Sequence, residues 1–122
     1  MQIRQDITQP IFLQIAQGIE DAILSNAYKE EEQIPSITEF STTYKINPAT
    51  ALKGINILVD SNIIYKKRGL GMFVTTGAKK ILKDKRKEQF FKTYIEQMLE
   101  EAKRLDIGLE EIKAMIERGG LR

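Results

Sequence analysis

The four residues at positions 45–48, Lys-Ile-Asn-Pro, constrain the fold of this chain more than any other part of its sequence. On either side of them, apolar residues recur at helical spacing, which indicates two short amphipathic helices. Asn is a preferred N-cap and Pro suits the first helical position, so Asn47 and Pro48 begin a second helix directly after the first one ends. Two helices joined so tightly cross at a large angle. This is the helix-turn-helix arrangement, in which the second helix presents its N-terminal residues to the major groove of DNA.

The chain before this joint supplies one more helix. Helical spacing predicts it over residues 10–25, with an extended arm at residues 1–9 and a polar loop at residues 26–35. Ser36 then caps the first helix of the helix-turn-helix, and Glu39 completes a capping box. The apolar stripe of the helix at residues 10–25 is expected to be buried.

A β-hairpin is predicted after the helix-turn-helix. Two β-prone runs flank a basic turn at residues 66–71, and Gly69 and Gly71 fit positions that need a positive φ or a close backbone approach. The basic residues of this turn are Lys66, Lys67 and Arg68. A hairpin in this place is a wing, and its cationic tip can reach phosphates or the minor groove.

The tail is predicted to form a long helix over residues 79–105 and a short final helix. The apolar seam of the long helix, narrow enough for a partner helix, consists of Phe91, Ile95, Met98, Ala102 and Leu105. The final helix carries Leu109, Ile112, Met115 and Ile116. The seam could pack on this final helix, but a helix of about 27 residues is about 40 Å long, and the short final helix cannot cover all of that length. We therefore expect a second copy of the chain to cover it, as a homodimer.

Composition narrows the classes of protein that fit. The chain has no Cys and no His, which removes disulfides, thiolate chemistry, the commonest metal ligand and the commonest general base. The sequence shows no acid pair, phosphate loop or metal-ligand cluster, so we expect no cofactor and no metal, and an enzyme is disfavoured. No apolar run is long enough to cross a bilayer and the N-terminus is unlike a signal peptide. We therefore expect no membrane partner and a cytoplasmic location.

The order and spacing of these motifs resemble those of a known family. Over residues 10–74, the segments PIFLQIAQGIEDAIL, IPSITEF and INPATALKGINILVDSNIIYKKRGLGMFV resemble the GntR family of bacterial winged-helix repressors. The tail QFFKTYIEQMLEEAKRLDIGLEEIKAMIE is similar to the two-helix dimerisation tail of the YtrA branch, and INPAT matches that branch's VNPNT phrase. The tail is too short for the ligand-sensing domains of most other branches. A small effector at a dimer interface would leave no motif, so that question stays open.

The resemblance implies a set of DNA contacts in this chain. Ser36 matches a serine that is typically near a phosphate, and Lys53 matches a basic residue one turn into the recognition helix. The start of that helix is matched by Asn47, Pro48, Ala49 and Thr50. The wing turn is matched by Arg68, Gly69 and Gly71.

Taken alone, some of these residues have a simpler interpretation. Asn47 and Thr50 could be helix-start residues only. The basic run at residues 79–87 could be a solvated helix turn or a DNA contact.

Four positions depart from the family pattern. Thr38 stands where the family has an arginine that usually contacts DNA, and Ala49 replaces the second asparagine of the recognition helix. In the wing, Leu70 replaces a basic residue and Met72 replaces a threonine. These changes suggest weaker or differently specified binding, for which Lys66 and Lys67 could compensate.

The sequence thus predicts a mainly α fold with a small β wing. A winged helix-turn-helix DNA-binding domain is expected at residues 1–77 and a helical dimerisation tail at residues 78–122. The expected function is that of a homodimeric, sequence-specific transcriptional regulator, a repressor, that binds a palindromic operator in double-stranded DNA. The alternative is a winged-helix protein-interaction module that has lost specific DNA reading, which Thr38, Ala49 and Leu70 favour.

Overall fold

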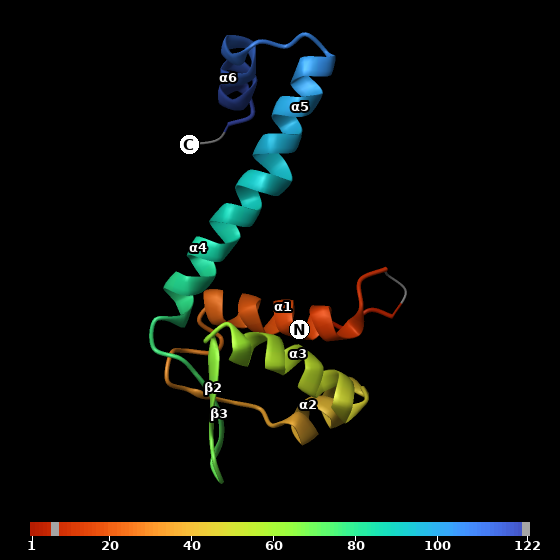
Figure 1. Cartoon of the computed structure of the whole chain (residues 1–122), viewed down its shortest axis with the longest axis vertical. Helices are drawn as coiled ribbons and strands as arrows, with labels where there is room; N and C mark the ends of the chain where they lie inside the picture. The colour runs from red at the N-terminus through yellow and green to blue at the C-terminus, as the bar shows by residue number, and fades with distance from the viewer. Residues whose placement is uncertain (6–7, 121–122) are drawn as a thin grey trace. The chain divides into compact units, whose positions relative to one another are not determined.

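The computed structural model describes residues 1–5 and 8–120, so positions 6 and 7 of the predicted N-terminal arm lie outside it. The elements, in order, are α1 (Ile11–Leu24), β1 (Gln33–Ile34), α2 (Ile37–Tyr44), α3 (Pro48–Asp60), β2 (Ile64–Lys67), β3 (Gly71–Val74), α4 (Ala78–Phe90), a π-helical segment η1 (Phe91–Glu96), α5 (Gln97–Arg104) and α6 (Leu109–Arg118) (Figure 1). The chain divides into two compact units, Met1–Asp84 and Lys85–Arg122. The predicted fold class, mainly α with a small antiparallel sheet, is confirmed.

Helices α1 and α3 pack against each other in the first unit (Figure 1). The predicted stripe of α1 is buried at Ile15, Ile19 and Ile23, which belong to one hydrophobic core. The two helices approach closely at Gly54 of α3, where a Cβ would lie 2.6 Å from the carbonyl oxygen of Phe12. Because that neighbour is backbone, it has little room to move, and the crossing depends on glycine.

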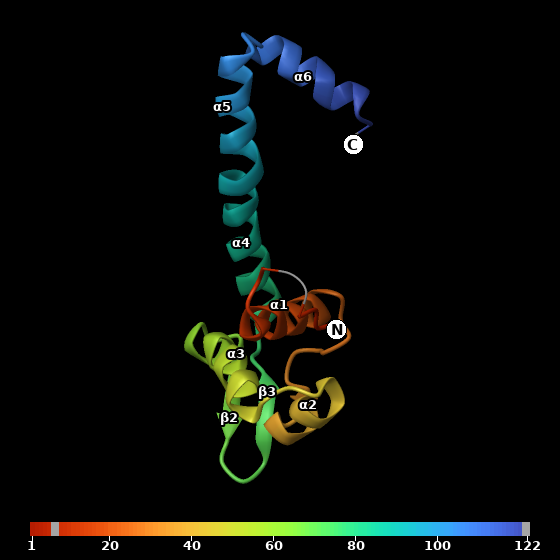
Figure 2. The ribbon, with the colours of Figure 1, turned by 90° about the vertical axis from the view of Figure 1, so that its right-hand side faces the viewer.

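The turn between α2 and α3 forms as its residues predict. Ser36 accepts a hydrogen bond from the Glu39 amide at 3.1 Å, and the Glu39 carboxylate accepts one from the Ser36 amide at 3.1 Å, which is the predicted capping box. Helix α2 ends at Lys45, which adopts a left-handed conformation with φ 54°. Asn47 then caps α3, with Pro48 in the first helical position. Figure 2 shows the two short helices beside the hairpin.

The sheet contains a strand that the sequence did not predict. The hairpin strands β2 and β3 pair antiparallel, as expected, with Tyr65 opposite Phe73. Strand β1 pairs with the other edge of β3, which gives the order β1-β3-β2. The segment at residues 26–35 is therefore not only a polar loop, and that prediction was incomplete. The strand has only two residues, too few to show a pattern of alternation, and it forms because its backbone pairs with β3.

The hydrophobic core of the first unit extends into α4. Ala78 and Leu82 are fully buried and belong to the same cluster as the α1 and α3 side chains. The division between the two compact units accordingly falls after Asp84, whereas the sequence led us to place a domain boundary at Gly77.

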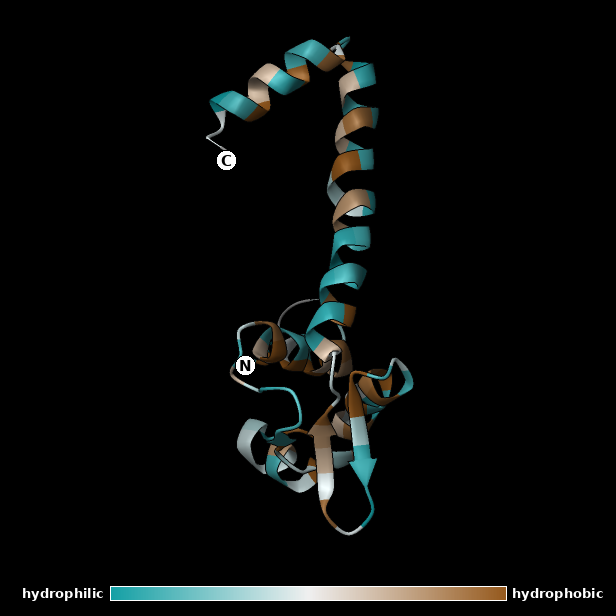
Figure 3. Ribbon diagram, turned by 90° about the vertical axis from the view of Figure 1, so that its left-hand side faces the viewer, coloured by the Kyte–Doolittle hydropathy of each residue, from teal (hydrophilic) through white to brown (hydrophobic). Residues whose placement is uncertain are grey.

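The second unit departs from a regular α-helix at η1. A π-helix bonds each residue to the fifth one along, so it interrupts the four-and-three spacing on which the predicted seam was based. Bands of hydrophobic residues still alternate with hydrophilic ones along α5 and α6 (Figure 3). Ala102 and Ile112 are buried, while Phe91 and Leu105 are exposed. Between the two helices, Asp106 takes a left-handed conformation with φ 56°, and Gly108 is the N-cap residue of α6.

Candidate nucleic-acid interface

The first turn of α3 is capped by Asn47 and is exposed to solvent. The side-chain oxygen of Asn47 accepts a hydrogen bond from the amide of Ala49 at 2.8 Å. Asn47, Pro48 and Ala49 are exposed, and Thr50 is half-buried. The cap function of Asn47 is thus present in the structure, and it leaves the first turn of α3 accessible to a large ligand.

The outward face of α3 is formed by residues spaced three and four apart: Ala49, Leu52, Lys53 and Asn56. Together with Ile57 and Asp60 they line a shallow hollow of about 380 Å³. The Lys53 ammonium lies 4.0 Å from the centre of the Phe12 ring of α1, a cation–π contact that orients this lysine. Lys53 is exposed, so its charge is still available to a phosphate.

The wing lies beside this face of α3. Lys66 of β2 donates a hydrogen bond to the side-chain oxygen of Asn56 at 3.2 Å, which joins the hairpin to α3. The Lys67 ammonium lies 5.3 Å from the centre of the Phe73 ring. Arg68 and Gly69 in the turn are exposed. The structure therefore brings basic residues of the wing and the outward face of α3 together.

Gln33 of β1 fixes the tip of the wing and was missed from the sequence. Its side-chain amide donates a hydrogen bond to the Leu70 carbonyl oxygen at 2.7 Å. Gly71 adopts φ 127°, which favours glycine, and a Cβ there would lie 2.5 Å from the Gln33 amide nitrogen, so the Gln33 side chain would have to shift. The glycines of the turn were predicted, but Gln33 is far away in sequence and carries no local signal of its contact with the wing tip.

Two glutamates of the loop before β1 hold the base of the wing. The carboxylate of Glu31 accepts hydrogen bonds from the hydroxyls of Tyr65, at 2.9 Å, and Thr76. These bonds lower the pKa of Glu31, Thr76 having the larger effect, and the same contact raises the pKa of Tyr65. Glu30 accepts a hydrogen bond from the Gly77 amide at 2.8 Å, at the start of α4. The loop thus fastens both β2 and the beginning of α4.

Helix α2 contributes the remaining predicted DNA contacts, Ser36 and Thr38. Both are exposed and lie at the N-terminal end of α2. The Ser36 oxygen is used in the capping box, but a serine hydroxyl that accepts one hydrogen bond can still donate another. Met72, by contrast, is buried in the core. The replacement of the family's threonine at this position therefore changes the packing of the core and not the exposed surface of the wing.

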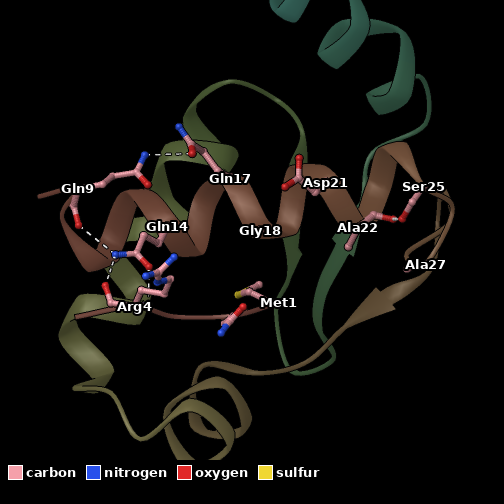
Figure 4. Close-up of a pocket in the computed structure, with 11 residues that line it drawn as sticks. Met1, Arg4, Gln9, Gln14, Gln17, Gly18, Asp21, Ala22, Ser25 and Ala27 are labelled. Carbon is pink, nitrogen blue, oxygen red and sulfur yellow. Dashed lines mark hydrogen bonds between the residues drawn. The ribbon is translucent and has the colours of Figure 1, made fainter. Parts of the chain in front are cut away.

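The N-terminal arm lies against α1. Gln14, a buried polar residue of α1, accepts a hydrogen bond from the Arg4 amide and donates one to the Arg4 carbonyl, each 2.7 Å long (Figure 4). It also donates to the Gln9 carbonyl at 3.0 Å. Met1 and Arg4 line a cavity of about 540 Å³ on this side of α1, and its lining contains no residue of α3 or the wing. The cavity is therefore separate from the candidate interface.

The tail presents an apolar surface. A groove of about 330 Å³ is lined by Met98, Ala102, Leu105, Ile107, Ile112, Met115, Ile116 and one charged residue, Glu101. Leu105, Leu109 and Ile116 are exposed, and Ile95 and Met98 are half-buried. The rings of Phe90 and Tyr94 pack at a tilt of 51°, with their centres 5.4 Å apart. Five of the predicted dimerisation residues line this groove: Met98, Ala102, Leu105, Ile112 and Ile116. Leu109 does not line it, and Phe91 and Ile95 lie in η1.

Among residues 1–5 and 8–120, no three metal-ligating side chains of the His, Cys, Asp or Glu type cluster closely enough to hold a metal ion. In the same residues, no helix has the length and apolar character needed to cross a membrane.

Comparison with known proteins gives several relatives of nearly the same length, although no family model matches the chain. It is 29% identical over 114 residues to YhcF of Bacillus subtilis, an uncharacterized HTH-type transcriptional regulator, covering 92% of this chain and 94% of YhcF. It is 28% identical over 116 residues to the HTH-type transcriptional repressor YtrA of the same organism, covering 95% of this chain and 88% of YtrA. A crystal structure from Bacteroides thetaiotaomicron, described as a transcriptional regulator of the GntR family, is 38% identical, with a TM-score of 0.77 and coverage of 88% of this chain and 94% of that one.

Proposed function

Since the chain belongs to the GntR family of winged-helix transcriptional regulators and is of its YtrA-like type, we propose that it is a homodimeric repressor that binds a palindromic DNA operator. Its relatives are transcriptional regulators, so the chain is a regulator and not an enzyme. We expect it to act in the cytoplasm, where it would meet DNA.

One observation carries the proposal: the exposed first turn of α3 lies on the same unit as a basic wing that is bonded to it. The Lys66–Asn56 hydrogen bond joins the two elements. In a winged helix-turn-helix, the N-terminal residues of the second helix enter the major groove, and basic side chains beside it contact phosphates. Lys53, Lys67 and Arg68 are exposed and suitably charged for the second task.

The proposed homodimer rests on the tail. The groove of about 330 Å³ is lined mainly by apolar residues of α5, α6 and the segment between them, and η1 also exposes apolar side chains. A second copy of this surface has matching apolar character. In a two-fold dimer each subunit contributes the same patch, and the two α3 helices would meet two half-sites one helical turn, or a multiple of it, apart. A palindromic operator follows from that symmetry.

The proposal also states the direction of regulation, which is repression. It is supported by the relationship to YtrA, which is a transcriptional repressor. In a transcription assay in vitro, the purified protein should reduce the transcript from a promoter that contains its selected binding sequence. An increase in that transcript would identify an activator instead.

The DNA interface is tested by fluorescence anisotropy with a duplex that the full chain selects from a random pool. Lys53→Ala and Arg68→Ala should each weaken binding by about three- to tenfold, as loss of one phosphate contact does. Lys113→Ala is the matched control, because this exposed lysine of α6 lies outside the proposed interface. Unchanged affinity in both test variants would show that the interface is misassigned.

A winged-helix protein-interaction module is the second candidate. The exposed Thr38, Ala49 and Leu70 favour it, because each replaces a side chain that could bind DNA. The same titration separates the two functions. A selected duplex bound far more tightly than a random one supports the regulator, and equal, weak binding to both supports the interaction module.

A further inference from the structure

The polar side chains on the outward face of α3 already have partners within the protein. The Lys53 ammonium lies over the Phe12 ring, and the Asn56 oxygen accepts from Lys66. Ala49 and Leu52 lie on the same face, both exposed, and Leu52 is 38% accessible. The two residues of this face that are not engaged in a polar contact, Ala49 and Leu52, are therefore apolar, and Lys53 and Lys66 lie beside them.

The chemistry of the major groove offers one apolar group that such a face can recognise. Thymine carries a 5-methyl group there, whereas the other base edges present hydrogen-bond donors and acceptors. Bidentate recognition of guanine uses arginine or lysine. Helix α3, with the sequence PATALKGINILVD, contains no arginine, and its one lysine, Lys53, lies over the Phe12 ring. The face is thus better suited to thymine than to guanine.

We propose that Leu52, with Ala49 beside it, is a specificity-determining residue that reads thymine methyl groups in each half-site. The hollow of about 380 Å³ lined by both residues would receive the methyl groups, and Lys53 and Lys66 would lie towards the flanking phosphates. The inference rests on the proposed function, since it names the base that the recognition helix of the regulator reads. It also accounts for Ala49: an amide in its place would put a polar group beside the thymine methyl.

The test uses the full chain and the duplex selected from a random pool. Each thymine in a half-site is replaced in turn by deoxyuracil, which removes only the 5-methyl group. Loss of one buried methyl contact should raise Kd by about fourfold at one or two positions. In Leu52→Ala the thymine and deoxyuracil duplexes should bind with equal affinity. Leu70→Ala is the control, because it removes an equally large exposed side chain from the wing, and it should keep the fourfold preference.

Two results would overturn the inference while leaving the regulator in place. One is tight, selective binding that is indifferent to deoxyuracil at every position. The other is a preference for thymine that Leu52→Ala retains in full, with circular dichroism unchanged. Failure of the wild-type chain to prefer any duplex would instead overturn the proposed function itself, and the inference with it.

Discussion

The contact between Gln33 and the wing tip predicts that substitutions at Gln33 and Gly71 are not independent. Gly71→Ala introduces a side chain at φ 127°, a conformation that costs about 1–3 kcal/mol for a residue other than glycine. Its Cβ would also displace the Gln33 amide, whose hydrogen bond to Leu70 contributes about 1 kcal/mol. Gln33→Ala alone should cost about 1 kcal/mol. The double variant loses that hydrogen bond only once, so it should be about 1 kcal/mol more stable than the sum of the single effects.

The measurement is urea unfolding of the four proteins, followed by circular dichroism at one fixed chain concentration so that any association contributes equally. Gln33→Glu is a size-matched control that has no N–H to donate, and it should destabilise the wing at least as much as Gln33→Ala. Single effects that add to within about 0.3 kcal/mol, as for unconnected sites, would refute the coupling between β1 and the wing tip.

Four further predictions concern other parts of the chain. Ser36→Ala should lower the free energy of unfolding by about 1 kcal/mol in urea titrations, because it removes the capping box of α2. Gly54→Ala should lower it by about 1–3 kcal/mol despite the better helix propensity of alanine, because the new Cβ meets backbone; a more stable variant would contradict that packing. Hydrogen bonds lower the folded-state pKa of Glu31, so this carboxylate should make the wild type more stable than Glu31→Gln above the ordinary glutamate pKa of about 4.3. That difference in the free energy of unfolding should disappear as the pH falls through the folded-state pKa. A difference that does not vary with pH would contradict this role. Ile95→Glu combined with Met98→Glu should give monomers in sedimentation velocity, and a profile that remains dimeric would contradict the proposed tail interface.

Sequence reasoning found the elements whose signals are local. Asn47-Pro48 and the Ser36–Glu39 pair each act within a few residues, and the structure has the caps that they predict. The turn glycines were also found, because a positive φ leaves few other choices.

What the sequence did not reveal depends on pairs that are distant along the chain. Gln33 bonds to the wing tip and Glu31 to Tyr65 and Thr76, and nothing in the local sequence marks these residues as structural. The π-helical segment at residues 91–96 is a second case, because its residues also fit regular helical spacing. The contact of Lys53 with Phe12 joins two helices and likewise became visible only in the structure.

Whether the outward face of α3 lies in a DNA groove can be tested most directly by cross-linking. Because the chain has no cysteine, Ala49→Cys can carry a single photoreactive group, and Glu117→Cys on α6 provides the control. With the selected duplex, the probe at position 49 should cross-link to bases at two positions related by a two-fold axis, one in each half-site. Cross-linking no stronger than that from position 117 would contradict the claim.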